Sequence, residues 1–151
     1  MEYTIERIEL SPQHVAVVSD RVPHDGIGPF VGRAFGQVMG VLGPAGVQPI
    51  GPPLARYDLD GSDFLVEVGF PTATAIETSG LVHDIELPGG SAVTCLHVGA
   101  YDAVAGAYRA LESWMDEHDL VPTSAPWESY LDGPEVAQPR TIVTWPCAPR
   151  T

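Results

Sequence analysis

Pro126-Trp127-Glu128-Ser129-Tyr130-Leu131-Asp132 is the part of this 151-residue chain from which most of its fold and function can be inferred. It places one carboxylate, that of Glu128, between two large aromatic side chains. A comparable stretch, Gly51-Pro52-Pro53-Leu54-Ala55-Arg56-Tyr57, occupies the corresponding place in the first half of the chain. The pair of stretches predicts that the two halves share one structural plan.

The pattern around these stretches has the same order in both halves. Each half reads as an apolar strand, a glycine-containing turn, an amphipathic helix, a proline-rich turn with an aromatic anchor, and a closing strand that ends in proline. The expected elements of the first half are strands at 14–19 and 64–71, a helix at 29–42 and a turn at Tyr57. Those of the second half are strands at 91–97 and 140–146, a helix at 101–118 and a turn at Tyr130. This order predicts an α+β fold made of two β-α-β-β halves.

Both expected helices carry an apolar stripe that predicts burial against a sheet. Because each has only one apolar face, both should lie on the same side of the sheet. The first helix also places Gly32, Gly36 and Gly40 on one face, four residues apart. Glycine lacks a side chain, so this face predicts a close approach of the helix to another backbone. In the second helix the stripe, which includes Tyr108 and Trp114, is assigned mainly to the core.

Composition and charge restrict the classes of function. Hydrophobic residues make up 44% of the chain, which suits one compact domain spanning residues 1–151. Seven basic and 20 acidic residues give a net charge of −13, which disfavours nucleic acid and anionic membranes as partners. The negative field favours cationic small molecules, although an acidic surface also serves solubility alone. The N-terminal residues lack a signal-peptide pattern, and no apolar run reaches the roughly 20 residues of a membrane span, so a cytoplasmic protein is expected.

Several other chemistries lack a motif. Cys95 and Cys147 have neither metal-type spacing nor enough partners for a disulfide framework, so buried, reduced thiols are expected. The five histidines are scattered, which predicts no metal site and a structural role for His97. Residues 26–32 depart from the dinucleotide-binding fingerprint, and no serine-nucleophile elbow is present. The sequence therefore predicts no metal and no cofactor.

Four motifs together resemble a known family. They are Pro88-Gly89-Gly90, His97-Val98-Gly99-Ala100-Tyr101-Asp102, Leu111-Glu112-Ser113-Trp114 and Trp127-Glu128-Ser129-Tyr130-Leu131. In this order and spacing they are similar to the GyrI-like small-molecule-binding domain, which also forms the effector-binding part of AraC-type and BmrR-type transcription regulators. The resemblance covers nearly the whole chain.

The resemblance implies a duplicated β-α-β-β fold with pseudo-twofold symmetry, in which antiparallel sheets enclose a central ligand pocket and the helices pack behind them. It also implies that Glu128 is the pocket glutamate that faces cationic, aromatic ligands. Trp127, Tyr130, Tyr57 and Tyr101 are candidate ligand-binding residues that could instead support the core. No segment resembles the helix-turn-helix of the regulators, so a stand-alone member is expected.

Two functions of different classes remain open at this point. The preferred one is a binding protein for hydrophobic or cationic small molecules that acts as a sensor, buffer or detoxification protein. The alternative, implied by some family members, is a hydrolase of strained cyclopropane-containing genotoxic compounds, with Glu128 as the catalytic residue. A protein partner such as DNA gyrase ranks last, because no surface in the sequence marks it. Glu128 could also lie at a turn in water, or order the loop through backbone amides.

Overall fold

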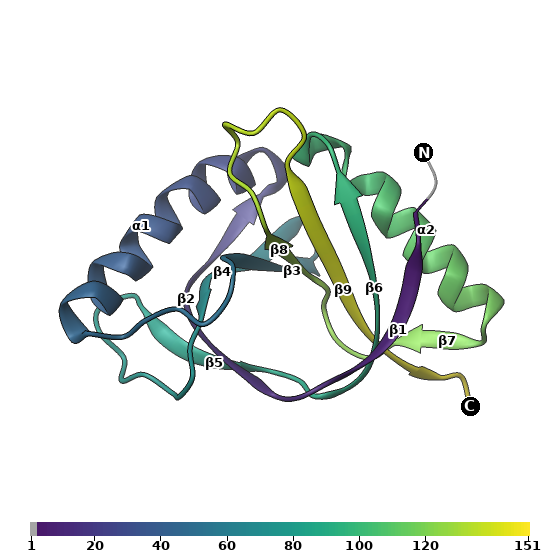
Figure 1. The fold of residues 1–151 in the computed structure, drawn as a ribbon, viewed down its shortest axis with the longest axis horizontal. Coiled ribbons are helices and arrows are strands. Elements are labelled where there is room, and N and C mark those ends of the chain that lie inside the picture. Colours follow the sequence, from purple (N-terminus) through teal and green to yellow (C-terminus); the bar gives the residue numbers. More distant parts are fainter. Residues whose placement is uncertain (1–2) are drawn as a thin grey trace. The chain divides into compact units, whose positions relative to one another are not determined.

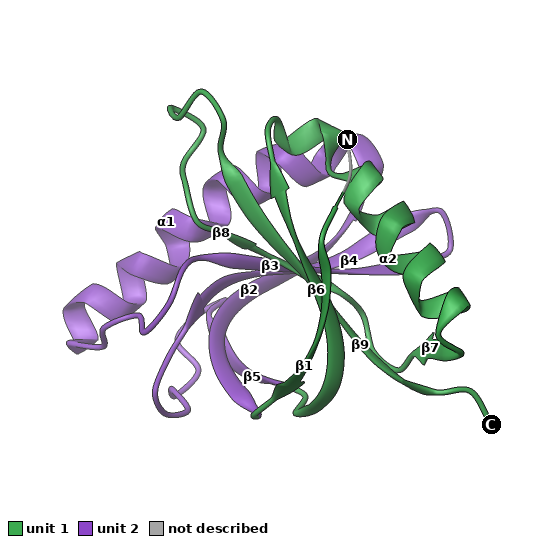
Figure 2. Ribbon diagram, turned by 45° about the vertical axis from the view of Figure 1, so that its right-hand side comes forward, with its two compact units in different colours: residues 1–11, 88–151 green, residues 12–87 purple. Residues whose placement is uncertain are grey.

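The structure is a computed structural model that describes residues 3–151 of the chain. The described residues form an α+β protein with two α-helices, two short 3-10 helices and nine strands (Figure 1). Strands that pair within one compact unit of the chain run antiparallel. The chain divides into two compact units, which Figure 2 colours separately. Unit 1 comprises Met1–Ser11 and Pro88–Thr151, and unit 2 comprises Pro12–Leu87.

Unit 2 is a four-stranded sheet with one long helix. Its elements in chain order are β2 (Gln13–Pro23), η1 (His24–Gly26), α1 (Ile27–Ala45), β3 (Leu54–Asp60), β4 (Asp63–Pro71) and β5 (His83–Leu87). The strands pair in the order β3-β4-β2-β5. The helix buries Phe30, Ala34, Val38 and Leu42 and ends where Gly46 adopts a left-handed conformation, with φ of 71°. The predicted elements 14–19, 29–42 and 64–71 therefore occur, each within a longer helix or strand.

The predicted close approach of the glycine face of α1 is wrong. Gly32, Gly36 and Gly40 are exposed, and an added Cβ at any of them would meet no atom within 4 Å. The buried row of α1 includes Ala34 and Val38, which each lie two residues from a glycine. Two residues correspond to a rotation of about 200° around a helix, so the glycines face away from the core.

Unit 1 carries the predicted site on its own strands. Its elements are β1 (Ile5–Leu10), β6 (Gly90–Val98), η2 (Tyr101–Ala103), α2 (Ala105–Glu117), β7 (Leu120–Pro122), β8 (Trp127–Tyr130) and β9 (Arg140–Pro149). The strands pair in the order β1-β6-β9-β8, and β7 also pairs with β9. The helix packs on one face of this sheet through a core of Val93, Cys95, Ala107, Leu111, Met115, Leu120, Val143 and Cys147. Each large aliphatic side chain buried there contributes about 1.5 to 3 kcal/mol.

The turns predicted at Tyr57 and Tyr130 are strands in the structure. Tyr57 lies in β3 and Tyr130 lies at the end of β8. The prolines that suggested turns precede the strands: Pro53 lies directly before β3, and Pro126 lies directly before β8. At these positions the missing N–H of proline removes no hydrogen bond from the sheet. Strand geometry changes the interpretation of the site, because neighbouring residues of a strand point to opposite faces.

The expectation of buried, reduced thiols is confirmed. Cys95 and Cys147 are buried free thiols, and burial raises the pKa of Cys95 to about 11. Arg56 forms an ion pair with Glu67 at 2.6 Å. Neither helix of the described chain is long and apolar enough to cross a membrane.

Candidate functional site

Glu128 lies on the face of the unit 1 sheet that α2 covers. It stands opposite Val143 of β9, and Val143 in turn stands opposite Cys95 of β6. Val143 and Cys95 both belong to the core against which α2 packs. Directly paired residues share one face of a sheet, so Glu128 points toward the helix. Its side chain is buried, with 7% of the residue exposed.

Two tyrosine hydroxyls hold the carboxylate of Glu128. Tyr108 of α2 donates a hydrogen bond to Oε2 at 2.6 Å, and Tyr130 of β8 donates one to Oε1 at 3.0 Å. Among the residues that the structure describes, no arginine, lysine or histidine forms an ion pair with Glu128. The acid is therefore hydrogen-bonded at both oxygens but forms no ion pair within residues 3–151.

Burial raises the pKa of Glu128 above the ordinary value for glutamic acid. The hydrogen bonds from Tyr108 and Tyr130 lower this pKa, but burial outweighs them. The native state therefore binds the proton more tightly than the unfolded state. The contribution of Glu128 to stability consequently falls as the pH rises from the ordinary glutamic acid pKa through the raised one.

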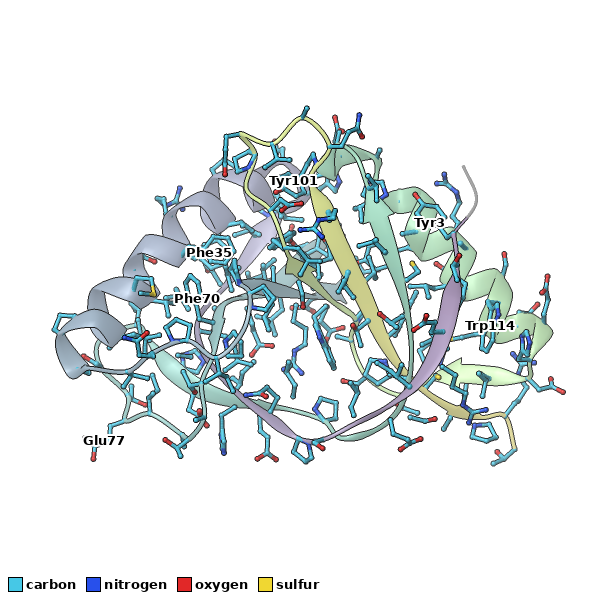
Figure 3. The ribbon with its side chains drawn as sticks, viewed as in Figure 1. Tyr3, Phe35, Phe70, Glu77, Tyr101 and Trp114 are labelled. Atoms are coloured by element: carbon cyan, nitrogen blue, oxygen red, sulfur yellow. The ribbon has the colours of Figure 1, made fainter. Side chains whose placement is uncertain are left out.

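A second aromatic ring supports each of the two tyrosines. The ring of Tyr101 meets Tyr130 edge to face, with centroids 5.6 Å apart, and Trp145 of β9 meets Tyr108 in the same way at 5.8 Å. Figure 3 shows Tyr101 near the end of β9 where the 131–139 loop joins the strand. Edge-to-face pairs of this kind fix ring orientation. The donors to Glu128 are thus held in place from both sides.

An ion pair closes the loop beside these rings. Arg140 donates to Oδ2 of Asp132 at 2.8 Å and to Oδ1 at 3.1 Å, and the Arg140 side chain holds the pKa of Asp132 below its usual range. The backbone oxygen of Asp132 accepts the hydroxyl of Tyr101. Because the bidentate contact fixes Asp132, it also fixes the position of the Tyr101 ring.

The structure places the residues predicted from the sequence in both units. Glu128, Tyr130 and Tyr101 lie together in unit 1, and Tyr57 belongs to β3 of unit 2. Trp127 is buried but lies next to Glu128 on the same strand, and therefore faces the opposite side of the sheet. The expectation that Glu128 lies between Trp127 and Tyr130 is correct for Tyr130 alone.

Tyr108 was missed as a partner of Glu128. Its position in the apolar stripe of the second helix suggested a core role, and its ring does pack in the core. A signal was nevertheless present, since a tyrosine hydroxyl that enters a core usually needs a hydrogen-bond partner there. Among the described residues, the acid that is buried is Glu128.

His97 has the structural role that the sequence predicted. It is 2% exposed, and its Nε2 lies 2.9 Å from the backbone oxygen of Ala100. A carbonyl oxygen only accepts, so Nε2 carries a hydrogen and Nδ1 is free to accept the hydroxyl of Tyr3, also at 2.9 Å. Tyr3 lies beside α2 (Figure 3).

A cavity of about 840 Å³ is lined by Tyr3, His97, Arg109 and Gln138, among others. Glu128 is not among the residues that line it. Within residues 3–151, no group of three or more histidine, cysteine, aspartate or glutamate side chains is placed to hold a metal ion.

The comparison with protein families decides the assignment. The model of the GyrI-like small molecule binding domain matches residues 1–144, which is nearly the whole sequence. The chain belongs to this family. A comparison with curated proteins found no match.

Solved structures share the GyrI-like fold at low sequence identity. EcmrR in a complex with DNA is 21% identical with a TM-score of 0.82, and the match covers 97% of this chain and 58% of that one. The C-terminal domain of EcmrR is 22% identical with a TM-score of 0.80, and the match covers 99% of this chain and 99% of that domain. This chain thus spans 58% of the EcmrR chain in that DNA complex.

Two further relatives carry functional descriptions of their own. SAV2435, solved bound to tetraphenylphosphonium, is 13% identical with a TM-score of 0.65, covering 98% of this chain and 94% of that one. A hydrolase from Listeria innocua is 13% identical with a TM-score of 0.70, and the match covers 96% of this chain and 92% of that one. At these identities the likeness shows the fold alone.

Proposed function

We propose that this protein binds lipophilic cations, with Glu128 as the charge that selects them. The observation that carries the proposal is a buried carboxylate that accepts two tyrosine hydroxyls and has no ion-pair partner among the described residues. Taking an ionised carboxylate out of water costs several kcal/mol unless it is paired. A cation that arrives beside Glu128 offsets this cost, and a neutral molecule of the same shape does not.

The surroundings of Glu128 suit a lipophilic cation in particular. Tyr108, Tyr130, Tyr101 and Trp145 all lie within one network of edge-to-face rings and hydrogen bonds around the acid. A cation over such rings gains about 0.5 to 2 kcal/mol for each contact, with little directional requirement. Because Glu128 is 7% exposed, binding requires these side chains or the adjoining backbone to move.

The relatives support the same class of ligand. SAV2435 was solved with tetraphenylphosphonium, a lipophilic cation, and the part of EcmrR that this chain matches is its C-terminal domain. We extend this ligand class to the present chain because Glu128 supplies the negative charge for it. A role as sensor, buffer or detoxification protein is consistent with such binding.

We also infer that the fold arose by duplication. In unit 2 the strand β2 leads into α1 and then to β3 and β4, and in unit 1 β6 leads into α2 and then, after the short β7, to β8 and β9. The strand orders β3-β4-β2-β5 and β8-β9-β6-β1 correspond position by position. This correspondence supports two β-α-β-β repeats within a single GyrI-like domain.

The pH dependence of binding tests the role of Glu128. Tetraphenylphosphonium is charged at every pH, so any titration comes from the protein. We expect its affinity to fall as the pH is lowered through a pKa above the ordinary glutamic acid value, because protonation removes the charge that the cation meets. Well below that pKa the loss should approach about tenfold per pH unit.

Fluorescence or calorimetric titration across pH 4 to 8 measures this dependence, within the range in which the protein stays folded by circular dichroism. Glu128→Gln serves as the control, because its remaining affinity should be independent of pH over the same range. An equal pH dependence in the wild type and in Glu128→Gln would contradict the proposal.

Hydrolysis is a second candidate, favoured by the raised pKa of Glu128 and by two hydroxyl groups beside it. A carboxylic acid can protonate one carbon of a strained ring while water adds to the other carbon of the breaking C–C bond, and the proton that the water releases then restores the acid. We expect a cyclopropane-bearing electrophile to be ring-opened faster than in buffer, with Glu128→Gln reduced to the buffer rate. Chromatography of the products checks this, and equal rates for wild type and buffer would reject hydrolysis of that substrate.

A further inference from the structure

The hydroxyl of Thr141 is buried without a hydrogen-bond partner. Thr141 is 0% exposed, and no donor or acceptor in the described part of the chain reaches its Oγ1. Buried polar atoms are nearly always hydrogen-bonded, and one left unpaired costs about 1 to 3 kcal/mol. Valine would fill the same volume in β9 without this cost. The hydroxyl therefore needs an explanation that packing does not supply.

Thr141 is a neighbour of Glu128 on the same face of the sheet. It stands opposite Tyr130 of β8 and opposite His97 of β6, and the next inward pair on that face is Glu128 with Val143. Thr141 and Glu128 are thus diagonal cross-strand neighbours, whose Cβ atoms typically lie about 7 Å apart. One ligand atom can lie within hydrogen-bond distance of both side chains across such a gap, since each bond spans about 3 Å.

The other polar groups around Thr141 already have partners. The hydroxyl of Tyr130 donates to Glu128, and the two ring nitrogens of His97 are occupied by Tyr3 and the backbone of Ala100. Thr141 Oγ1 is the only buried side-chain polar atom of unit 1 without a partner in the described residues. An unpaired hydroxyl therefore lies next to a carboxylate that has no ion-pair partner in the described part of the chain.

We propose that Thr141 is a second polar anchor of the Glu128 site and accepts an N–H from the bound cation. The inference rests on the proposed function and adds a substrate class to it. Preferred ligands are protonated primary or secondary amines on an aromatic framework, because such an ammonium group donates to Glu128 and Thr141 at once. A quaternary ammonium or phosphonium ion has no N–H and leaves the hydroxyl unpaired.

The test compares two cations that share one framework. The probes are 9-anthracenylmethylammonium and its N,N,N-trimethyl analogue, both of which are cations at pH 7, and binding is followed by fluorescence. Thr141→Val, which keeps the shape but removes the oxygen, should weaken binding of the primary ammonium by about tenfold or more, as expected for a hydrogen bond to a charged group. Affinity for the quaternary cation should change less than about twofold, because this cation has no hydrogen bond to the hydroxyl that the substitution could remove. The ratio of the two affinities is compared between the wild type and the variant, so the effect of the added methyl groups, which is present in both proteins, cancels.

Two control variants separate the hydroxyl from packing. Thr141→Ser keeps the oxygen and loses a methyl group, so it should retain the preference for the primary ammonium. Thr144→Val alters a buried threonine of the same strand that faces the opposite side, and should leave both affinities unchanged.

The outcomes distinguish this inference from the proposed function. If Thr141→Val leaves the affinity ratio of the two cations at its wild-type value, the role of Thr141 is overturned, and Glu128 remains supported as long as Glu128→Gln weakens binding of both cations. If neither cation binds the wild type, both proposals fall. Loss of the preference in Thr141→Val with its retention in Thr141→Ser supports the anchor.

Discussion

Glu128→Gln should weaken binding of a lipophilic cation by about 2 to 5 kcal/mol, which corresponds to roughly 30-fold to several-thousand-fold in the dissociation constant. Glutamine keeps the shape of the side chain and can still accept a hydrogen bond from Tyr108 or Tyr130, so the variant removes mainly the charge. A neutral analogue of the cation should bind the variant at least as well as it binds the wild type, because the desolvation cost of the carboxylate is gone.

Calorimetric titration of both proteins with a matched cationic and neutral dye measures the two effects. Glu112→Gln is the matched control, because it removes one charge from the exposed side of α2 in the same unit. A solvent-exposed charge contributes little, so this control should change cation affinity less than about threefold. If Glu128→Gln also stays within a factor of three, Glu128 is not the charge that the ligand meets.

Gly69→Ala should destabilise the protein by about 3 kcal/mol or more. Gly69 lies in β4, opposite Val17 of β2, and a Cβ at this position would overlap the backbone carbonyl of Ala16. Backbone atoms cannot give way as the end of a side chain can. The substitution therefore has to displace β2 from β4 and break ladder hydrogen bonds in the centre of the unit 2 sheet.

Urea denaturation followed by circular dichroism measures the loss as a lower midpoint at a constant slope. Gly40→Ala in α1 is the matched control, since nothing lies within 4 Å of its added methyl group. Alanine in an exposed helical position should raise stability by about 0.5 to 1 kcal/mol. A loss below 1 kcal/mol in Gly69→Ala would mean that the strands can separate locally without cost.

The contrast between these glycines shows why sequence alone misplaced the close contact. A row of glycines spaced four apart on a helix predicts tight packing, and a single glycine in a strand attracts less attention. Which face of α1 meets the sheet depends on the larger apolar side chains, and Ala34, Val38 and Leu42 determine it. The glycine that cannot be replaced is set by the distance between β4 and β2, which no local pattern encodes.

The elements of the fold and the central acid were predictable because they depend on short-range patterns. Apolar periodicity placed α1 and α2, and an acid beside aromatic residues marked Glu128, as did the resemblance to the GyrI-like family. Local chemistry also indicated the buried thiols and the structural role of His97.

The identity of the groups around Glu128 was decided by tertiary structure. Trp127 is adjacent in sequence but faces away, whereas Tyr108 lies 20 residues earlier and donates the shortest hydrogen bond to the acid. Thr141 becomes its neighbour only through the register of β8 on β9. A strand alternates its faces and a register joins distant residues, so the sequence marked Glu128 as a candidate pocket acid, and strand pairing and helix packing determined that it is buried and what surrounds it.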